Sequence, residues 1–585
     1  MAWFDPKMIA LLRLNGYPAL ILLSILLLAF SLYRRIKPKP IPGIPYNKLS
    51  SQRILGDVPD FLSHVERTNG TIITFLLERL QSLNAPLVQV FLSPVDKPLL
   101  ILADYRETVE VLRRKEFDRS TRAAGLLKGL GPAHHIRQRT NSIWRAQRFL
   151  IKDLMTPTFL HGVAGPILYQ SCLSLIDLWR VKSRIAGERH WVASEDLDLA
   201  VLDAVIGFTF GAGCVHNAIE PALRRLKDLD TEAIEKLKAH DRAIKKAVEF
   251  PDPGLDEVLY SCVQVMQSIM EVQGSIWPSL HWEYVAQKPR VKKARKVKDE
   301  FILRELKDAV DRMESGVDRE KSAVDNMVRR AKIIAEKEGR APDYFSRVMI
   351  DEAFGFIVAG QDTTSTALSW GVKLLADNPS VQTKLRNTSQ AVYTKALQEQ
   401  RNPTKDEIVN VPNPYLDATI EEILRTGGVV PMIDREAIVD TQILGHHVPK
   451  GTGILCLTQG PSFMSPAFNI DEGRRSVSSQ EVRKDLRVSP WDHTDIGVFQ
   501  PERWLGAGDS FDPAAGPCLA FSTGLRQCYG KRLAYLEMKV LLELIIWNFE
   551  LLPCPDELSK YTSVMHMTSR PRNCYVRLRE VELSG

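Results

Sequence analysis

Apolar residues recur at three- and four-residue spacing along most of the chain between residues 105 and 425. The spacing is clear in 201–210, 301–334 and 344–377, where charged residues occupy the opposite face. A period near 3.6 residues is typical of amphipathic helices that pack on a core. Residues 531–549 show the same period, so the pattern predicts a mainly helical body that extends late into the chain.

Shorter segments predict strands. Residues 86–102 hold two apolar runs with a turn between them, which predicts a hairpin, and residues 434–457 return to short strands around a turn at 450–453. Residues 575–578 predict a closing strand, whereas the polar stretch 469–492 predicts an irregular surface insertion. No internal repeat is evident. The predicted fold class is therefore mainly α with a minor β-sheet region, in one large domain.

An uncharged apolar segment, 14–33, lies near the N-terminus. As a helix it would span about 30 Å, the thickness of the bilayer hydrocarbon. Basic residues are denser after it (Arg34, Arg35, Lys37 and Lys39) than before it (Lys7 and Arg13). By the positive-inside rule this places the rest of the chain on the cytosolic side. A cleaved signal peptide is the alternative, but no small-residue cleavage site follows the segment, which favours an anchor.

These features divide the chain into three parts. Residues 1–36 hold the anchor and its flanks, residues 37–46 form a proline-rich hinge, and residues 47–585 form the main domain. Proline lacks a backbone donor and favours extended, stiff backbone. The hinge is therefore expected to act as a spacer that holds the main domain at the membrane.

Composition and charge exclude several classes of protein. The 44% apolar and 25% charged content is near the globular average. The net charge of +6, from 77 basic and 71 acidic side chains, does not suggest nucleic-acid binding. Eight cysteines include no C-x-x-C pair, which excludes a zinc ribbon or a disulfide scaffold and favours a reducing compartment. Each cysteine is by default a small buried apolar residue.

Cys528 departs from this default because of its neighbours. It lies between Gly524 and Gly530, two residues after Arg526, directly before a predicted helix. The glycines permit a close approach to a flat cofactor, and backbone N–H groups at the helix start are expected to lower the pKa of the thiol. A thiolate is the form that binds metals, and Arg526 suits a carboxylate. The sequence predicts a metal-ligand loop.

Residues 521–530 match every fixed position of Phe-x-x-Gly-x-Arg-x-Cys-x-Gly, the haem-binding signature of the cytochrome P-450 superfamily. The chain resembles this family, and in overall style its fungal members of specialised metabolism. The resemblance implies a P-450 fold in which Cys528 binds the iron of haem b and the cofactor is contacted by Phe521, Gly524, Arg526 and Gly530. It also implies a monooxygenase that hydroxylates or epoxidises an apolar substrate, with a terpenoid or polyketide secondary metabolite as the expected class.

The segment 359–364, Ala-Gly-Gln-Asp-Thr-Thr, lies inside a predicted apolar helix, where an acid is costly to bury. It resembles the oxygen-activation motif of the family's long central helix. A threonine hydroxyl competes with the helix's own hydrogen bonds, and a carboxylate relays protons. The resemblance assigns these catalytic roles to Asp362 and Thr363. A helix N-cap or a surface kink would explain the motif equally well if it stood alone.

Glu422 and Arg425 are one helical turn apart and resemble the family's Glu-x-x-Arg motif, which Arg503 of the later Pro-Glu-Arg-Trp segment completes as a structural network behind the haem. The same spacing elsewhere is interpreted as ordinary surface ion pairs, at Glu110/Arg113, Glu116/Arg119 and Glu472/Arg475.

Three further residues are expected to hold the haem propionates. Trp144 and Arg148 match the family's Trp-x-x-x-Arg on one helix face, and Arg435 follows where many relatives have another propionate partner. A half-buried tryptophan packed on an arginine stem is the alternative interpretation of the first two.

The resemblance implies that electrons come from another protein, because no dinucleotide-binding G-x-G-x-x-G turn follows a strand. The expected partner is an NADPH-dependent flavoprotein reductase, so NADPH is used only indirectly, with Arg526, Lys531 and Arg532 near the docking face. The expected place is the endoplasmic reticulum membrane, single-pass, with the catalytic domain cytosolic. Two alternatives stay open: a haem-thiolate isomerase or dehydratase, against which the intact Asp362 and Thr363 pair argues, and a non-catalytic haem sensor or electron carrier.

Apolar residues are expected to line the substrate pocket. By resemblance, the lining comes from residues 120–135, the helix around Phe356 and Ala359, the loop 429–433 and residues 564–567.

Overall fold

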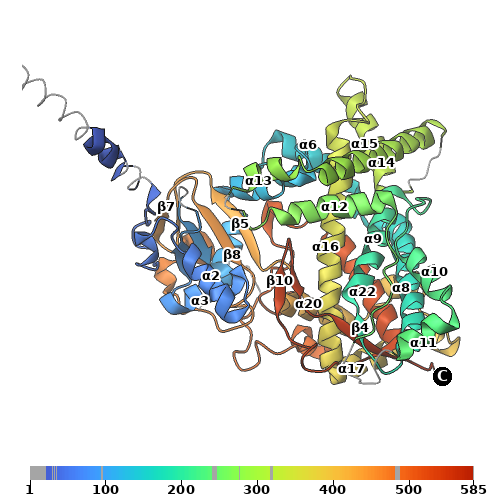
Figure 1. The fold of residues 1–585 in the computed structure, drawn as a ribbon. Helices are drawn as coiled ribbons and strands as arrows, with labels where there is room; N and C mark the ends of the chain where they lie inside the picture. The colour runs from blue at the N-terminus through green and yellow to red at the C-terminus, as the bar shows by residue number, and fades with distance from the viewer. Residues whose placement is uncertain are drawn as a thin grey trace, which may run out of the picture.

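A computed structural model gives the structure of the chain and describes residues 21–583 apart from 29, 32, 34–35, 94–96, 240–246, 276, 317–320 and 481–487. In this part of the chain, helices form a large body and most strands gather in a smaller region beside it (Figure 1). The predicted fold class, mainly α with a minor β-sheet region, is confirmed.

The long helix α16 (Arg347–Asp377) runs through the helical body (Figure 1). It is packed against α9 (Ser194–Phe210), α20 (Pro414–Gly427) and α22 (Lys531–Asn548). Almost every side chain from Met349 to Ala376 is buried. A helix enclosed in this way exposes little to water, so each acid on it must find its partners inside the protein.

The other principal helices complete the body and flank the sheet. They are α2 (Val58–Thr68), α3 (Ile72–Leu83), α4 (Tyr105–Arg113), α5 (Thr121–Leu126), α6 (Ser142–Leu150), α8 (Gly165–Ala186), α10 (Ile219–Lys227), α11 (Thr231–Ala239), α12 (Glu257–Glu271), α13 (Pro278–Val285), α14 (Pro289–Glu314), α15 (Ala323–Lys337) and α17 (Pro379–Val392).

The main sheet has five strands in the order β1-β2-β8-β5-β3, namely Leu87–Val90, Leu99–Leu102, Gly453–Leu457, Met432–Ala437 and Phe117–Asp118. The predicted hairpin is confirmed, because β1 and β2 pair antiparallel with Leu87 opposite Leu102. Strands β5 and β8 confirm the strands predicted between 434 and 457, and β6 (Thr441–Ile443) and β7 (His446–Val448) form a hairpin between them.

Two smaller sheets lie within the helical body. The predicted closing strand is β12 (Tyr575–Glu580), which pairs with β9 (Phe549–Leu552) and β4 (Trp191–Val192). Strands β10 (Ser563–Met565) and β11 (Ser569–Pro571) form a hairpin that contacts α16. Residues 564–567, predicted to line the substrate pocket, lie on β10 and in the turn of this hairpin.

The predicted anchor is described only in part, since residues 14–20 and several positions up to 35 lie outside the described residues. Residues 21–28 are helical, and their side chains are exposed, with Leu27 at 60% and Leu28 at 62%. The helix stands away from the body (Figure 1). Exposed apolar side chains in such a row favour transfer into lipid. Among the described residues, Pro157–Ala186 is the one helical segment long and apolar enough to span a membrane, but its buried side chains belong to the main core.

The proline-rich segment 37–46, predicted to be a spacer, is bound to the sheet. Ile41 and Ile44 are buried in the apolar cluster under β1 and β2. The Gln89 side chain accepts a hydrogen bond from Ile41 N at 2.8 Å and donates to the carbonyls of Ile41 and Ile44 at 2.9 and 2.8 Å. A buried amide thus satisfies the backbone of this segment, and the chain is fixed to the body before α2 begins.

Most of the described residues of the insertion 469–492 are exposed, as predicted, but Arg475 and Ser479 are buried and anchor it in the interior. The Arg475 side chain is 5% exposed and lies 2.8 Å from Asp104 Oδ1 and 2.9 Å from Glu107 Oε1. Ser479, also buried, donates to Glu107. Glu472 lies 3.5 Å from Arg475, so the predicted pair exists, but it is not an ordinary surface pair.

The other two predicted surface pairs are also wrong. Glu110 and Glu116 both pair with Arg114, at 3.4 and 3.1 Å, rather than with Arg113 and Arg119. Arg119 instead lies close to Asp118 and Asp434. A spacing of three residues permits an ion pair but does not select it when tertiary partners compete.

Replacing Arg475 with alanine is expected to lower the free energy of unfolding by about 3 kcal/mol or more, because Asp104 and Glu107 would remain buried without their cation. Urea denaturation of both proteins at neutral pH measures the difference. Arg340→Ala, which removes an exposed pair with Glu338, is the control and is expected to change it by less than about 0.5 kcal/mol. Equal, small losses for the two variants would contradict the buried setting of Arg475.

Candidate functional site

The loop 521–530 closes on itself directly before α22. Cys528 N donates to the Phe521 carbonyl at 2.9 Å, and a short turn, η9 (Gly524–Arg526), fills the space between them. Cys528 is exposed, whereas the other seven cysteines, all within the described residues, are buried or half-buried. This residue therefore borders accessible space, which a core residue does not do.

The surroundings of Cys528 act on its pKa in opposite directions. Protein atoms crowd the sulfur, and this desolvation raises the pKa of the thiol. The N–H groups of Gly530 and Lys531 and the charge of Arg148 oppose the rise but do not outweigh it. The predicted lowering of the pKa is therefore wrong for the protein alone. A metal ion at the sulfur would supply the positive charge that a thiolate needs.

Gly524 and Gly530 are glycines for different reasons. Gly524 has a φ of +75°, and a Cβ there would lie 2.5 Å from the Leu112 carbonyl oxygen at the end of α4. The chain itself therefore requires this glycine, without any cofactor. Gly530 has an ordinary φ of −76°, and a Cβ there would meet nothing within 4 Å. A Cβ thus has open space at Gly530 and not at Gly524, and room for a flat cofactor stays a prediction for Gly530 alone.

Four arginines that are distant in sequence influence one another near this loop. Burial, together with the charge of Arg119, lowers the pKa of Arg435 and of Arg526 to about 10. Arg148 also acts on Arg526, and the two guanidinium groups lie 5.9 and 4.8 Å from the Trp144 ring. Buried like charges repel, so this arrangement needs anions.

The protein does not supply enough of those anions. Among the described residues, Arg435 Nη2 and Arg526 Nη1 have no hydrogen-bond partner although both atoms are buried. Asp118 and Asp434 are the acids that act on the arginine cluster most directly. Unpartnered guanidinium groups suit a ligand that carries carboxylates. Together with the exposed Cys528 and the open space at Gly530, they fit haem, a flat iron porphyrin with two carboxylate arms.

Arg119 is a member of this cluster that the sequence did not reveal, since its spacing from Glu116 suggested a surface pair. Arg526 was also expected near the docking face of a reductase, and this stays a prediction. Arg526 is half-buried and donates to the Gln138 carbonyl at 2.9 Å. Lys531 and Arg532, at the start of α22, are exposed.

The three residues predicted to form a structural network are in contact. The buried Glu422 carboxylate accepts from Arg425 at 2.7 and 2.8 Å and from Arg503 Nε at 3.1 Å. It also accepts from Trp504 Nε1 and from Gln500 N, each at 2.9 Å. These bonds tie α20 to the turn η7 (Pro501–Trp504). A carboxylate satisfied by so many donors fixes both segments strongly.

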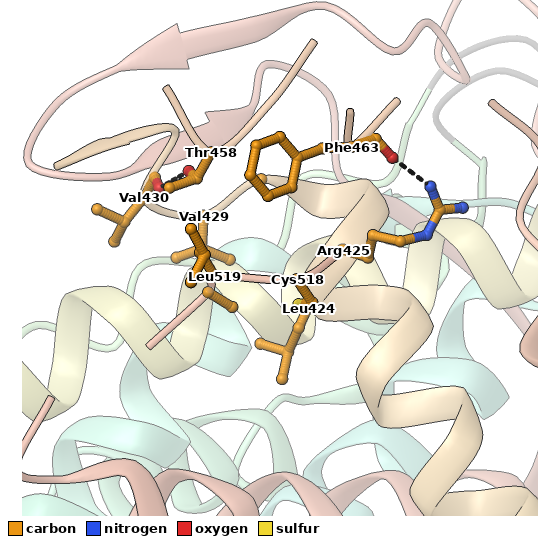
Figure 2. Close-up of a pocket in the computed structure, with 10 residues that line it drawn as sticks. Leu424, Arg425, Val429, Val430, Thr458, Phe463, Cys518 and Leu519 are labelled. Atoms are coloured by element: carbon orange, nitrogen blue, oxygen red, sulfur yellow. Dashed lines mark hydrogen bonds between the residues drawn. The ribbon is translucent and has the colours of Figure 1, made fainter. Parts of the chain in front are cut away.

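Arg425 extends the network toward the cysteine loop. It donates to the carbonyls of Phe463 and Ile496, each at 2.7 Å, and the bond to Phe463 is seen in Figure 2. The same view shows Cys518 and Leu519, just before the cysteine loop, lining a small pocket together with α20 (Figure 2). The segment that leads to Cys528 therefore rests on elements that Arg425 holds in place.

The motif on α16 lies well inside the helix, which begins at Arg347. The N-cap interpretation is therefore excluded. Thr363 Oγ1 donates to the Ala359 carbonyl at 2.7 Å, the competing bond that the sequence predicted. Asp362 is 1% exposed, and neither of its oxygens has a hydrogen bond of good geometry within the described residues, although the Thr568 hydroxyl lies near enough to influence it.

A charged network lies beside Asp362. Burial raises the pKa of the Asp362 carboxyl, and the positive charge of Arg570 on β11 opposes this rise. Arg570 donates to Asp198 on α9 and to Ser365 Oγ at 3.1 Å. A buried, unpartnered acid beside these groups is suited to proton movement rather than to structural support.

Comparisons with known proteins agree with this site. The family model described as Cytochrome P450 matches residues 58–460 and 495–575, and the gap between them contains the insertion. Cytochrome P450 monooxygenase TRI13 of Fusarium sporotrichioides is 40% identical over 587 residues, which cover 96% of this chain and 99% of that protein. Cytochrome P450 monooxygenase xilC of Penicillium rubens is 34% identical over 558 residues, with 94% of each chain covered.

Alanine at Gly524 and at Gly530 is expected to have different effects. Gly524→Ala should lower the free energy of unfolding by about 2 kcal/mol, because the left-handed backbone and the Leu112 carbonyl both oppose a Cβ. Gly530→Ala should leave it within about 0.5 kcal/mol of the original but weaken cofactor retention. Thermal unfolding and the haem content of the purified proteins measure the two effects. Full haem content in Gly530→Ala would show that the cofactor does not lie there.

Proposed function

Because the chain belongs to the cytochrome P450 family and is a haem monooxygenase, we propose that Cys528 binds the iron of haem b and that the product is an oxygenated, apolar secondary metabolite. The carrying observation is the exposed Cys528 close to buried arginines that lack partners. A thiolate and two carboxylate contacts are what this cofactor requires of a protein. When bound, the haem supplies the activation of dioxygen.

The roles of the chain's own residues follow from their positions. Cys528 is the metal ligand, and Arg148, Arg435 and Arg526 bind the carboxylates together with Trp144, whose ring lies near the guanidinium groups of Arg148 and Arg526. Phe521 accepts the backbone bond that closes the cysteine loop, and Gly530 leaves room for the flat ring. The network of Glu422, Arg425 and Arg503 fixes the segments on which the cysteine loop rests, and none of these three residues contacts the cofactor.

Asp362 and Thr363 handle protons in this proposal. The Thr363 hydroxyl donates to the Ala359 carbonyl, so at this turn the hydroxyl competes with the backbone N–H groups of the helix for that carbonyl. The side chain of Thr363 is half-buried, whereas Asp362 is buried, beside the Arg570 network. Asp362 passes a proton from that network to the Thr363 hydroxyl, which delivers it to the reacting oxygen.

The alternatives from the sequence are less well supported. An isomerase or dehydratase needs no proton delivery from outside. The chain nevertheless has the buried Asp362 and the hydrogen bond from the Thr363 hydroxyl to the Ala359 carbonyl, which suit proton delivery. A sensor or electron carrier does not need them either. The relatives TRI13 and xilC are named monooxygenases, which favours oxygen insertion.

The partner and the location complete the proposal. An NADPH-dependent flavoprotein reductase supplies electrons, and the exposed Lys531 and Arg532 lie at the end of α22 nearest the cysteine loop, where an acidic partner would dock. The exposed apolar helix 21–28 supports a single-pass anchor in the endoplasmic reticulum membrane, with the catalytic domain in the cytosol. A substrate of low polarity would enter from the same lipid.

Cys528→Ser is expected to abolish the red-shifted absorption band of the reduced carbon-monoxide adduct, because a serine oxygen does not replace thiolate coordination. Difference spectra of the purified proteins measure this. Cys554→Ser is the control and should keep the band, since Cys554 is half-buried and lies outside the loop. A red-shifted band in Cys528→Ser would overturn the ligand assignment.

Thr363→Ala is expected to lower the product formed per NADPH on the order of tenfold, because proton delivery loses its last donor. The measurement compares product, hydrogen peroxide and NADPH consumption in the reconstituted system. Thr388→Ala removes the same kind of bond, Thr388 Oγ1 to the Lys384 carbonyl at 2.7 Å, and should leave this ratio unchanged. An unchanged ratio in Thr363→Ala would exclude Thr363 from proton delivery.

A further inference from the structure

Two consecutive acids on α16, Asp351 and Glu352, hold the loop 131–135. Asp351 Oδ2 accepts from Ala133 N at 2.9 Å, and Glu352 Oε1 accepts from His135 N at 2.7 Å. Both acids are fully buried. They lie about three helical turns before the proton-handling pair and have no part in the roles above. The loop is therefore fixed to α16 at two backbone positions.

Glu352 also fixes the imidazole of His135. The ring's Nδ1 forms a hydrogen bond of 2.7 Å with Glu352 Oε2. The neighbouring His134 ring stacks on it with 4.7 Å between centroids. The Nδ1 bond and the stacking together define the ring's orientation. Nε2, on the opposite edge, points away from Glu352, and no hydrogen bond to it occurs among the described residues.

The free edge of His135 lies in the field of the arginine cluster. Desolvation, together with the charges of Arg148, Arg526 and Arg119, lowers the pKa of His135 to about 3. The ring therefore adds a further polar group to a region that already lacks anions. His134, His135 and Glu352 also have the donor atoms of a small metal site, within 4.8 Å of one another. Three nearby arginines disfavour a divalent cation there and favour an anion.

We propose that His135 is a further binding residue for a haem carboxylate, with Nε2 as the donor beside Arg148 and Arg526 and Glu352 as the positioning residue. This rests on the proposed function. A carboxylate at Nε2 would place the imidazole between two acids, where it takes a proton from solvent and becomes a charged donor on both edges. The loop over the cofactor would then be linked to α16 through the same ring.

The test is the rate at which the purified holoenzyme loses haem to an excess of apomyoglobin. His135→Phe keeps the ring and its stacking but has no donor, and is expected to release haem about tenfold faster. His135→Gln loses the ring but keeps a neutral donor, and is expected to fall between His135→Phe and the original protein. A packing role predicts the reverse order, because phenylalanine would be the better replacement. His447→Phe, at an exposed position of β7, is the control and should release haem at the original rate.

Glu352→Gln gives a second measurement that does not depend on the His135→Phe variant folding. Its amide is a weaker acceptor, so the ring is held less firmly, and release is expected to be about threefold faster. Release at the original rate in the folded variants, or the reversed order of Phe and Gln, overturns the inference. If the unaltered protein binds no haem, or lacks the thiolate band with carbon monoxide, the proposed function itself fails, and the two failures are thereby distinguished.

Discussion

The buried Glu422 carboxylate holds together the segments that support the cysteine loop. Its donors come from α20 and from 500–504, and Arg425 carries the connection on to the carbonyls of Phe463 and Ile496. A carboxylate in the interior is stable only when its oxygens are satisfied, so each of these segments is constrained by the others. The position of Cys528 at the start of α22 depends on this arrangement, although none of these residues touches its sulfur.

Two kinds of buried polar group matter for the site. Glu422 and Arg475 have partners of their own, and they join segments that are far apart in sequence. Arg435 and Arg526 retain buried donor atoms without partners, and Asp362 retains two such acceptors. An unsatisfied buried group costs free energy, so a folded protein keeps it where a ligand or a reaction uses it. At Arg435, Arg526 and Asp362 the missing partners are those that a ligand or a reaction would supply, whereas the Glu422 network supports the site.

The sequence predicted what depends on local pattern. The helices, the 86–102 hairpin and the strands of 434–457 follow from spacing, and the cysteine loop and the α16 motif follow from short motifs. The sequence did not predict the burial of Arg475, whose acids Asp104 and Glu107 lie some 370 positions earlier, or the place of Arg119. From the sequence alone, Gly524 was attributed to the close approach of a cofactor. The group that actually requires this glycine, the Leu112 carbonyl, is a contact across the fold that the sequence does not reveal. Long-range partners decide these cases, and no local rule contains them.

Helix α16 connects the parts of the site that must move least. Asp351 and Glu352 fix the loop 131–135 to this helix. Asp362 and Thr363 lie three turns further on. The β10–β11 hairpin packs on the same helix, where the hydroxyls of Thr366 and Thr568 lie 2.9 Å apart. A buried helix resists displacement because its whole surface is packed. The relative positions of the loop, the proton-handling pair and the hairpin are therefore set by one element. The side chains predicted to line the pocket, on the loop, on the hairpin and at Phe356 and Ala359 of the helix, can therefore differ without moving this frame.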